Sequence, residues 1–353
     1  MTMKEKILIV GGYGAVGSII AENLSKEYPN LVIITGRSFF KAEKMAEKLD
    51  HKVIPYQLDI NNITDFSILD DVTLVVMCLD QVNTDFVEYC ISQSIHYIDI
   101  SAQYETLKSI GNLHSLAVQH QSSVVLSVGL APGITNLLAQ YAAFQLENTK
   151  SIDIFILLGL GEKHGEFAYK WTFNTMDSEY LLSTNGTEQV MKSFTKPIET
   201  DLLGKRNFYL FDFSDQHVLA DTLNIPRIQT RMAFDLRWFT KLTAILRKLR
   251  ITKLFKNETI QNLAIKSFNN FPMGSDVYAV KVVAKDHSGN PKEVSITGNN
   301  EGRITAIVAT EIVLFLLNDN VPNGVFHSHQ IIKDIPLFLS NLKKYDSGFQ
   351  LKI

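Results

Sequence analysis

Two patterns of apolar and polar residues follow one another along the chain. Up to about residue 128, short apolar runs rich in β-branched residues alternate with longer segments of helical periodicity. The runs lie at residues 7–10, 31–35, 53–58, 73–79, 96–100 and 123–128. Such runs are typical of a parallel sheet that helices cover on both faces. Residues 1–130 are therefore predicted to form a doubly wound α/β domain of the Rossmann type.

Beyond this part the apolar runs become longer, and some of them alternate in polarity. A helix is predicted over residues 136–146. Strands are predicted at residues 151–161, 167–173, 206–213, 277–286 and 292–299. Alternation between turn signals indicates antiparallel strands with one exposed face. Residues 131–353 are therefore predicted to be a second, α+β domain with a mixed or antiparallel sheet for substrate binding and dimerisation, of which about 303–353 can return to the first domain.

A glycine-rich segment, KILIVGGYGAVGSIIAENL, joins the first predicted strand to the first helix. Gly12, Gly14 and Gly17 have the spacing G-x-G-x-x-G between a strand and an amphipathic helix, the context of a dinucleotide-binding turn. Gly12 permits the tight turn, Gly14 lets the backbone approach a pyrophosphate, and Gly17 lets the helix pack against the strand. The predicted cofactor contacts of this turn are Gly12, Tyr13, Gly14, Ala15 and Val16.

The end of the second predicted strand indicates which dinucleotide binds. An NAD site places Asp or Glu there, to accept hydrogen bonds from the ribose 2′-hydroxyl group. Here the strand ends in Gly36-Arg37-Ser38, with Lys41 one turn further on. Arg and Ser donate hydrogen bonds to a 2′-phosphate, which a carboxylate would repel. The sequence therefore predicts NADP(H), held by Arg37, Ser38 and Lys41.

Further cofactor contacts are expected where later strands of the parallel sheet end, because ligands of this fold bind at the carboxyl ends of the strands. Asp59 and Ile60 are expected to flank the adenine, and the segment 78–80 to lie near the nicotinamide ribose. A second glycine elbow, GLAPGITN, follows the sixth strand and is expected to approach the nicotinamide ring. The predicted contacts of this group are Asp59, Ile60, Cys78, Leu79, Ser101, Gly129 and Ala131.

A Tyr-x-x-x-Lys pair, Tyr104 and Lys108, raises an alternative. In short-chain dehydrogenases such a pair on a helix protonates a carbonyl oxygen, and this spacing puts both side chains on one helical face. However, Tyr104 follows the fifth strand almost at once, and Ser92, twelve residues before it, lies in the preceding predicted helix. A carbonyl reductase that uses Tyr104 and Lys108 remains an alternative hypothesis.

Six short motifs carry a resemblance to a known family. They are VGGYGAVG (10–17), TGRS with Lys41 (35–41), YIDIS (97–101), GLAPGITNLLA (129–139), FPMGSDVYAV (271–280) and VPNGVFHSHQ (321–330). On these motifs the chain resembles the saccharopine dehydrogenase-like oxidoreductases. The resemblance implies NADP-dependent hydride transfer at a C–N bond of an amino-acid, imine or polyamine-type substrate. Saccharopine reductase has a Thr-Ser-Tyr-like sequence after its fifth strand, and this chain departs from it with Ile100-Ser101-Ala102.

An amino-acid substrate carries a carboxylate, which an arginine binds well. Arg231 is the first candidate for this contact and Arg206 the second. Asp276 is predicted to bind a substrate amine or to orient a base. Asn136 and Tyr104 complete the predicted catalytic residues.

Two aromatic residues, Trp171 and Tyr180, are candidates for the wall of the substrate pocket. His164 is predicted to lie in a loop. His327 and His329 are given no role, because they lie far from the motifs in the sequence.

Composition excludes several classes of function. The net charge of −3 does not indicate a nucleic-acid-binding protein. The two cysteines, Cys78 and Cys90, have neither metal-ligand spacing nor a disulfide framework, so no metal is predicted. The longest apolar stretch, residues 304–317, is interrupted by Glu311, and the apolar run at the N-terminus is too short for a signal peptide. A cytoplasmic enzyme, most simply a homodimer, is predicted.

Residues 231–256 form a basic amphipathic stretch that contains one acid, Asp235. Trp238, Leu242, Ile245 and Leu249 share one helical face. This face is expected to point inward, in a solvated or substrate-covering helix; contact with a membrane surface or an acidic partner is the alternative. A protein of another class, a non-catalytic NADP(H) sensor, would use this stretch to bind its partner.

Overall fold

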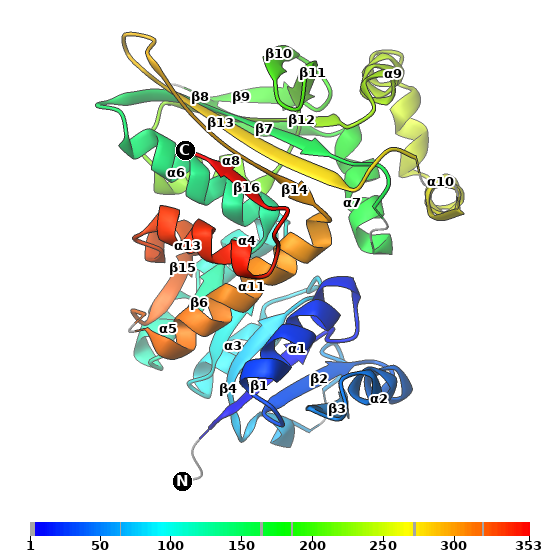
Figure 1. Cartoon of the computed structure of the whole chain (residues 1–353), viewed down its shortest axis with the longest axis vertical. Coiled ribbons are helices and arrows are strands. Elements are labelled where there is room, and N and C mark those ends of the chain that lie inside the picture. The colour runs from blue at the N-terminus through cyan, green and yellow to red at the C-terminus, as the bar shows by residue number, and fades with distance from the viewer. Residues whose placement is uncertain (1–3, 64, 163–164, 185, 271–272, 320) are drawn as a thin grey trace. The chain divides into compact units, whose positions relative to one another are not determined.

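The computed structural model describes residues 4–63, 65–162, 165–184, 186–270, 273–319 and 321–353. These residues form two compact units, Met1–Ile134 with Gly302–Lys333, and Thr135–Glu301 with Asp334–Ile353. Each unit contains its own sheet, of seven strands in the first and nine in the second (Figure 1).

The first unit is built on a parallel sheet in the order β15-β6-β5-β4-β1-β2-β3. Its strands are β1 (Lys6–Val10), β2 (Val32–Gly36), β3 (Val53–Gln57), β4 (Val72–Met77), β5 (His96–Asp99), β6 (Ser123–Leu126) and β15 (Gly324–His327). Strands β1 to β6 follow the order of the doubly wound Rossmann fold, so this prediction is confirmed. Strand β15 is a seventh, and it comes from a segment late in the sequence.

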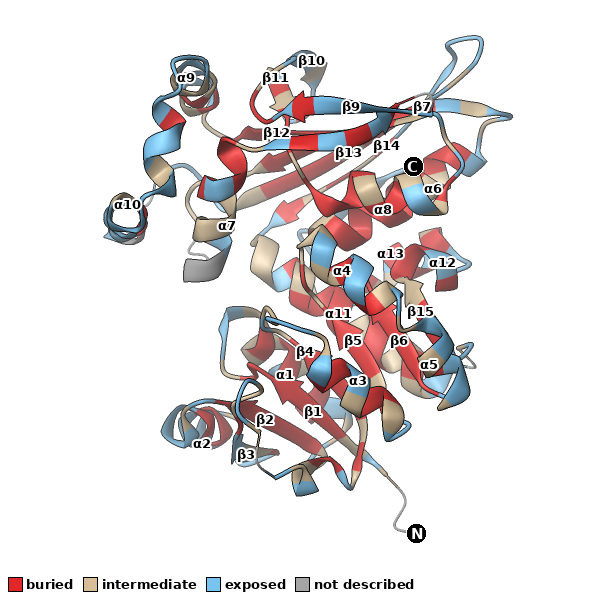
Figure 2. Ribbon diagram, turned by 180° about the vertical axis from the view of Figure 1, so that it is seen from behind, coloured by how far each residue is buried: buried red, intermediate tan, exposed pale blue. Residues whose placement is uncertain are grey.

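Helices cover both faces of this sheet, which is why its central strands are fully buried. They are α1 (Ala15–Glu27), α2 (Phe39–Lys48), α3 (Asp85–Ser92), α4 (Tyr104–Gly111), α5 (His114–Gln119), α11 (Glu301–Asn318), α12 (Ser328–Ile331) and the short turns η1 (Ser67–Leu69) and η2 (Leu130–Ile134). Helices α1 and α11 lie side by side on one face (Figure 1), where the Asn23 amide donates to the Thr310 hydroxyl at 3.4 Å. Helices α3 and α5 cover the other face (Figure 2).

The second unit contains a mixed sheet, as predicted. Its main path is β10-β11-β12-β7-β13-β14-β16, and β8, paired with β9, adds to β12. The strands are β7 (Thr149–Leu158), β8 (Glu179–Thr184), β9 (Thr187–Lys192), β10 (Ile198–Asp201), β11 (Lys205–Leu210), β12 (Arg227–Phe234), β13 (Val277–Asp286), β14 (Pro291–Asn299) and β16 (Gln350–Lys352). Only β7 and β12 pair in parallel among the described strands of this sheet.

The helices of the second unit fall into two groups. Helices α6 and α8 pack on one face of the sheet, and α7, α9 and α10 gather at one end of it (Figures 1 and 2). The helices are α6 (Thr135–Phe144), α7 (Glu166–Met176), α8 (Ser214–Thr222), α9 (Arg237–Lys248), η3 (Ile251–Lys256), α10 (Glu258–Asn270), α13 (Ile335–Asn341) and η4 (Leu342–Lys344).

One predicted strand of the second unit is wrong, because residues 167–173 belong to helix α7. Aromatic residues favour strands only where they find neighbours on a pleated surface. Here the Trp171 ring packs on Phe211 and Phe213, with centroids 5.7 and 5.4 Å away, and Phe173 stacks on Phe255 at 5.0 Å. Tertiary packing of these rings therefore outweighs the local strand preference.

A buried ion cluster joins the two parallel strands of this unit. The Asp153 carboxylate on β7 accepts two hydrogen bonds from Arg227, at 3.0 and 2.6 Å, and one from Arg231, at 2.6 Å. The Arg231 guanidinium also donates to the Gln229 side chain at 2.7 Å. Asp153 and Arg231 have 8 and 4% of their side chains exposed, so removing either partner would leave the other charge buried and unpaired.

We expect Asp153→Ala to lower the free energy of unfolding by about 3–5 kcal/mol, because two guanidinium groups then lose their carboxylate in a largely buried site. Urea denaturation at neutral pH measures the change. Glu179→Ala, which removes an exposed ion pair with Lys192 on the same sheet, is the control and should cost less than about 1 kcal/mol. Equal losses in the two variants would contradict a structural role of the cluster.

Candidate functional site

In the glycine turn after β1, backbone groups of the turn contact the backbones of β2 and of the first turn of α1. The N–H groups of Gly11 and Gly12 both donate to the Thr35 carbonyl, at 2.9 and 3.0 Å, and that of Gly14 donates to the Gly11 carbonyl at 2.8 Å. A Cβ on Gly17 would overlap the Gly11 carbonyl and lie 3.0 Å from the Gly12 Cα. Only glycine at residue 17 therefore lets α1 start this close to β1, in line with the sequence prediction.

The first turn of α1 is open to an anion. Gly14 is its N-cap residue and has no side chain to accept hydrogen bonds from the first N–H groups of the helix. Gly14 and Ala15 are exposed and Val16 is half-buried. Free N–H groups at a helix N-terminus with no side-chain cap fit a phosphate, so this end of α1 is suited to the pyrophosphate of a dinucleotide.

Tyr13 connects the glycine turn to the end of β2. Its hydroxyl oxygen accepts a hydrogen bond from the Ser38 N–H at 3.0 Å. A Cβ on Gly36 would overlap the Tyr13 hydroxyl, so the glycine makes room for the phenol. The glycine turn and the end of β2, which are both predicted to contact the cofactor, are therefore joined through Tyr13.

The cations predicted to bind the 2′-phosphate gather at the N-terminus of α2. Ser38 caps this helix, and its hydroxyl accepts from the Lys41 N–H at 3.4 Å. Arg37 is exposed, and its carbonyl accepts from the Gln57 amide on β3 at 3.1 Å. The backbone of this corner is held, while the Arg37 and Lys41 side chains remain exposed to solvent.

A polar network lies at the carboxyl ends of β4 and β5. The two Asp99 carboxylate oxygens accept hydrogen bonds from the Ser101 N–H at 2.6 Å and the Gln81 amide at 2.8 Å. The Ser101 hydroxyl donates to Asp80 at 3.3 Å, and the Tyr97 hydroxyl donates to Gln81 at 3.1 Å. One continuous network therefore links two carboxyl groups, Asp80 and Asp99.

Both carboxyl groups hold their protons more tightly than usual. Burial raises the pKa of Asp99 to about 7 and that of Asp80 to about 6, and the hydrogen bonds from Ser101 oppose the shift in each case. Sequence reasoning missed Asp99 and gave Asp80 only a general place near the ribose. The signal in the sequence was the position of Asp99 in YIDIS, at the end of a strand, but its burial was not visible there.

The second glycine elbow closes the same edge of the sheet. It comprises residues 127–134 after β6, with Ser127 at φ +55° and Gly133 at φ +140°. The Leu130 N–H donates to the Thr305 hydroxyl on α11 at 3.2 Å, so the returning helix fixes the elbow. Strands β1 and β6 are three strand positions apart, about 14 Å.

The remaining predicted cofactor contacts also follow the carboxyl ends of strands. Asp59 and Ile60 come after β3 and are half-buried, and the Asp59 carboxylate accepts from the Asn61 N–H at 3.1 Å. Cys78 and Leu79 come after β4; burial raises the pKa of the Cys78 thiol, and Leu79 is exposed. Ser101, Gly129 and Ala131 follow β5 and β6 as described. Their contacts with a cofactor stay predictions.

The predicted substrate residues Arg231 and Arg206 belong to the second unit and have protein partners. Arg231 is held by Asp153, so a substrate carboxylate would have to displace that carboxylate. Arg206 donates to the backbone carbonyls of Leu203, Gly204, Phe234 and Asp235. The geometry of both arginines favours a structural role.

Two further predicted residues of the second unit lie in contrasting surroundings. Asp276 is exposed and accepts a hydrogen bond from the Asn299 amide at 2.6 Å. Asn136 is the second residue of α6 and is fully buried, with its side-chain oxygen 3.4 Å from the Thr135 hydroxyl. Their predicted catalytic roles stay predictions.

The aromatic and histidine residues singled out in the sequence are placed as follows. Trp171 is on helix α7 and Tyr180 on β8, both in the second unit. His164 lies outside the described residues. In the first unit, the His327 Nδ1 is 2.8 Å from the Ser127 hydroxyl, and burial lowers the pKa of His329 to about 3.

The Tyr104–Lys108 pair of the short-chain alternative starts helix α4. The Lys108 ammonium lies over the face of the Tyr104 ring, 5.9 Å from its centroid. Within the described part of the chain, no cluster of His, Cys, Asp and Glu could hold a metal ion. The described helices include none with the length and apolarity needed to cross a membrane.

The first unit matches a known family. Residues 7–125 match the family model of the saccharopine dehydrogenase NADP binding domain. Residues 7–125 are thus similar to the NADP-binding domain of saccharopine dehydrogenases. The predicted resemblance and the predicted cofactor, NADP(H), are confirmed.

Solved structures extend this likeness to the fold of the whole chain. Apo saccharopine dehydrogenase (L-Glu forming) from Saccharomyces cerevisiae has a TM-score of 0.68 and 14% identity, over 99% of this chain and 100% of that one. A meso-dapdh variant with DAP from Clostridium tetani E88 has a TM-score of 0.43 and 13% identity, over 94% of this chain and 96% of that one. No curated protein sequence matches the chain.

At these identities the yeast structure shows a shared fold alone. Together with the saccharopine dehydrogenase NADP-binding domain, it supports an NADP-dependent oxidoreductase. The residues predicted to hold the cofactor lie at the carboxyl edge of that domain's sheet. The N-terminus of α1 at this edge suits the phosphates of the cofactor.

The buried carboxyl of Asp99 makes the stability of the NADP-binding domain depend on pH. An Asp in the unfolded chain titrates near 3.9, whereas the folded-state pKa of Asp99 is about 7. The folded state therefore binds the proton between these values, and its stability is lost as pH rises through them, by on the order of 2–4 kcal/mol. Asp99→Asn should largely remove this loss.

Urea denaturation at pH 5 and pH 8 measures the effect. Asp70→Asn, an exposed carboxyl in the same unit, is the matched control and should keep the pH dependence of the native chain. If Asp99→Asn retained the full difference between the two pH values, Asp99 would not be the group responsible.

Proposed function

We propose that this protein is an NADP(H)-dependent oxidoreductase that transfers hydride at a C–N bond of an amino-acid, imine or polyamine-type substrate. NADP(H) supplies or accepts the hydride, and the chain orients the reactants. The single observation that carries the substrate class is the pair of linked carboxyl groups, Asp80 and Asp99, at the carboxyl ends of β4 and β5.

Cofactor choice follows from charge at the end of β2. Arg37 and Lys41 are exposed beside the N-cap of α2, and residues 36–41 contain no carboxylate. A guanidinium forms bidentate hydrogen bonds with a phosphate. Arg37 would therefore bind the 2′-phosphate, with Ser38 and Lys41 beside it, and distinguish NADPH from NADH.

We expect Arg37→Asp to weaken NADPH binding by about 10- to 100-fold, because a charge-assisted hydrogen bond is replaced by repulsion. NADH binding should change little, because NADH lacks the 2′-phosphate. Fluorescence titration with each nucleotide measures both effects. Lys48→Asp makes the same charge change at the far end of α2 and should leave the preference intact; an unchanged preference in Arg37→Asp would refute the assignment.

The two carboxyl groups favour a substrate with a cationic nitrogen over a neutral ketone. Asp80 is half-buried, and its pKa of about 6 lets it carry a proton or a negative charge near neutral pH. A protonated amine or iminium is attracted to such a group, which can also exchange a proton with the nitrogen. A protonated imine already has an activated carbon, so positioning against the nicotinamide supplies much of the remaining rate.

We expect NADPH oxidation when an amine and a keto acid or aldehyde are supplied together, and none with the carbonyl compound alone. Asp80→Asn should lower kcat/KM for the active pair by about 100-fold, while the affinity for NADPH falls far less. Absorbance at the nicotinamide band measures the rate across a panel of such pairs. Asp70→Asn is the matched control.

Two outcomes of this panel would overturn the proposal. Turnover of ketones alone, lost in Tyr104→Phe, would favour short-chain carbonyl reductase chemistry. Tight NADPH binding without turnover of any pair would favour the NADP(H) sensor.

A further inference from the structure

Helix α9 exposes its apolar face to solvent. Trp238, Leu242, Ile245 and Leu249 recur at helical spacing, and they are 56, 40, 46 and 61% exposed. The expectation that this face points inward is therefore wrong. The apolar surface continues along η3, where Ile251 and Leu254 are 40 and 57% exposed.

The opposite face of α9 packs against the second unit and is mixed: the Phe239 ring lies on Phe234, with centroids 5.1 Å apart, beside polar side chains. Thr240 and Thr243 are 4 and 5% exposed, and the Arg247 side chain is 11% exposed. The Thr240 hydroxyl accepts a hydrogen bond from the Phe234 N–H at 2.9 Å, which ties the start of α9 to the end of β12. Helix α9 therefore has apolar side chains on both faces, whereas an ordinary surface helix keeps its apolar stripe inward.

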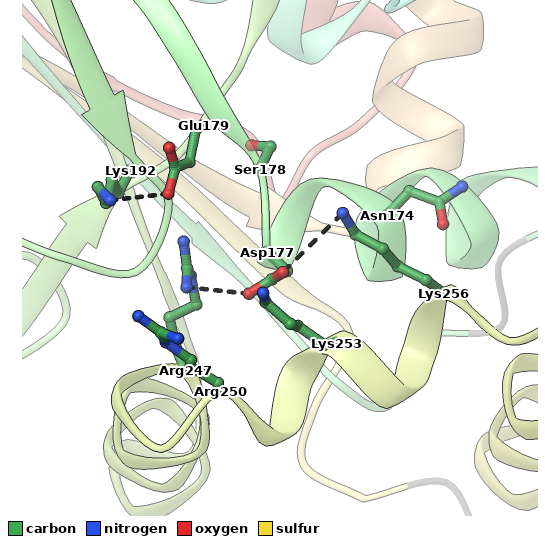
Figure 3. A pocket seen from close by; sticks show the side chains of 9 residues that line it. All are labelled: Asn174, Asp177, Ser178, Glu179, Lys192, Arg247, Arg250, Lys253 and Lys256. Atoms are coloured by element: carbon green, nitrogen blue, oxygen red, sulfur yellow. Dashed lines mark hydrogen bonds and ion pairs between the residues drawn. The ribbon is translucent and has the colours of Figure 1, made fainter.

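A buried carboxylate fixes this orientation. Asp177, at the end of α7, has 3% of its side chain exposed and pairs with Arg247 at 2.9 Å. It also accepts from the Thr252 hydroxyl at 3.0 Å and lies 4.0 Å from the Lys256 ammonium. Figure 3 shows Arg247 and Lys256 converging on Asp177 from α9 and η3. Rotating α9 to bury its apolar face would leave Asp177 without its arginine, at a cost typical of a broken buried pair.

The surface around the apolar face is strongly basic. Residues 237–256 contain seven Lys and Arg residues and no acid, in a chain of net charge −3. Lys241 and Lys248 follow Trp238 and Ile245 by three residues, so they border the apolar face. Behind α9, a cavity of about 540 Å³ is lined by five cations and two carboxylates, which adds to the positive field of this end of the unit.

We propose that α9 and η3 (residues 237–256) form a docking surface for an anionic lipid bilayer. Outward apolar side chains bordered by Lys, with a Trp at one end, are the features of a helix that lies in the membrane interface. A second copy of the chain fits this surface poorly. A two-fold contact would oppose the cations of residues 237–256 to themselves, with no acid among them to compensate.

Co-sedimentation of the full chain with vesicles tests the proposal. We expect binding to phosphatidylcholine vesicles that contain about 30 mol % phosphatidylglycerol, and at least roughly 10-fold weaker binding to phosphatidylcholine alone. Both Trp238→Ser/Leu249→Ser and Lys241→Glu/Lys248→Glu should lower binding to the anionic vesicles by roughly 10-fold or more. Lys241→Arg/Lys248→Arg should retain it, because the charge is kept.

The matched control is Leu181→Ser/Val190→Ser, which removes an exposed cross-strand apolar pair on β8 and β9 and should bind like the native chain. Circular dichroism checks that each variant is folded. Failure of the native chain to bind anionic vesicles, or unchanged binding by both charge-reversed and apolar-to-Ser variants, would overturn the proposal. Sedimentation velocity that shows a native dimer and a monomeric Trp238→Ser/Leu249→Ser variant would assign the surface to a second copy instead.

Discussion

The close approach of the Gly11–Gly12 backbone to the start of α1 is the constraint on which the NADP-binding domain depends. Gly17 has no Cβ that would overlap the Gly11 carbonyl, so the helix begins directly behind β1. Its free N–H groups then point to the carboxyl edge of a parallel sheet. Because every described strand of that sheet has its carboxyl end at this edge, the order of the strands decides which residues lie on either side of the glycine turn.

On one side lies β2, with Arg37 and Lys41, and on the other lie β4, β5 and β6, with the linked carboxyl groups and the second elbow. The site is therefore cationic at one end and acidic at the other. This polarity fits a cofactor with a 2′-phosphate on its adenosine ribose and a substrate with a cationic nitrogen. The two halves of the proposed function thus rest on opposite ends of one sheet edge.

Buried charges have different uses in the two units. In the second unit, Asp153 is matched by two arginines and ties β7 to β12. In the first unit, the Asp99 carboxylate accepts hydrogen bonds from the Ser101 N–H and the Gln81 amide, but burial outweighs them and raises its pKa. Asp177 in the second unit has a third use, since it sets which face of α9 points outward. The same residue type is structural, proton-binding or orienting according to its buried partners.

The sequence by itself determined the alternation of strands and helices, the glycine turn, the basic end of β2 and the helical period of residues 237–249. These features depend on local sterics, periodicity and charge, which the order of residues contains. The tertiary structure decided what depends on distant partners. Residues 167–173 are helical because their rings find Phe211, Phe213 and Phe255. Arg231 pairs with Asp153 instead of facing solvent, Asp99 is buried away from water, and α9 exposes its apolar face. Each of these follows from burial or pairing, which arise only when segments far apart in the chain come together.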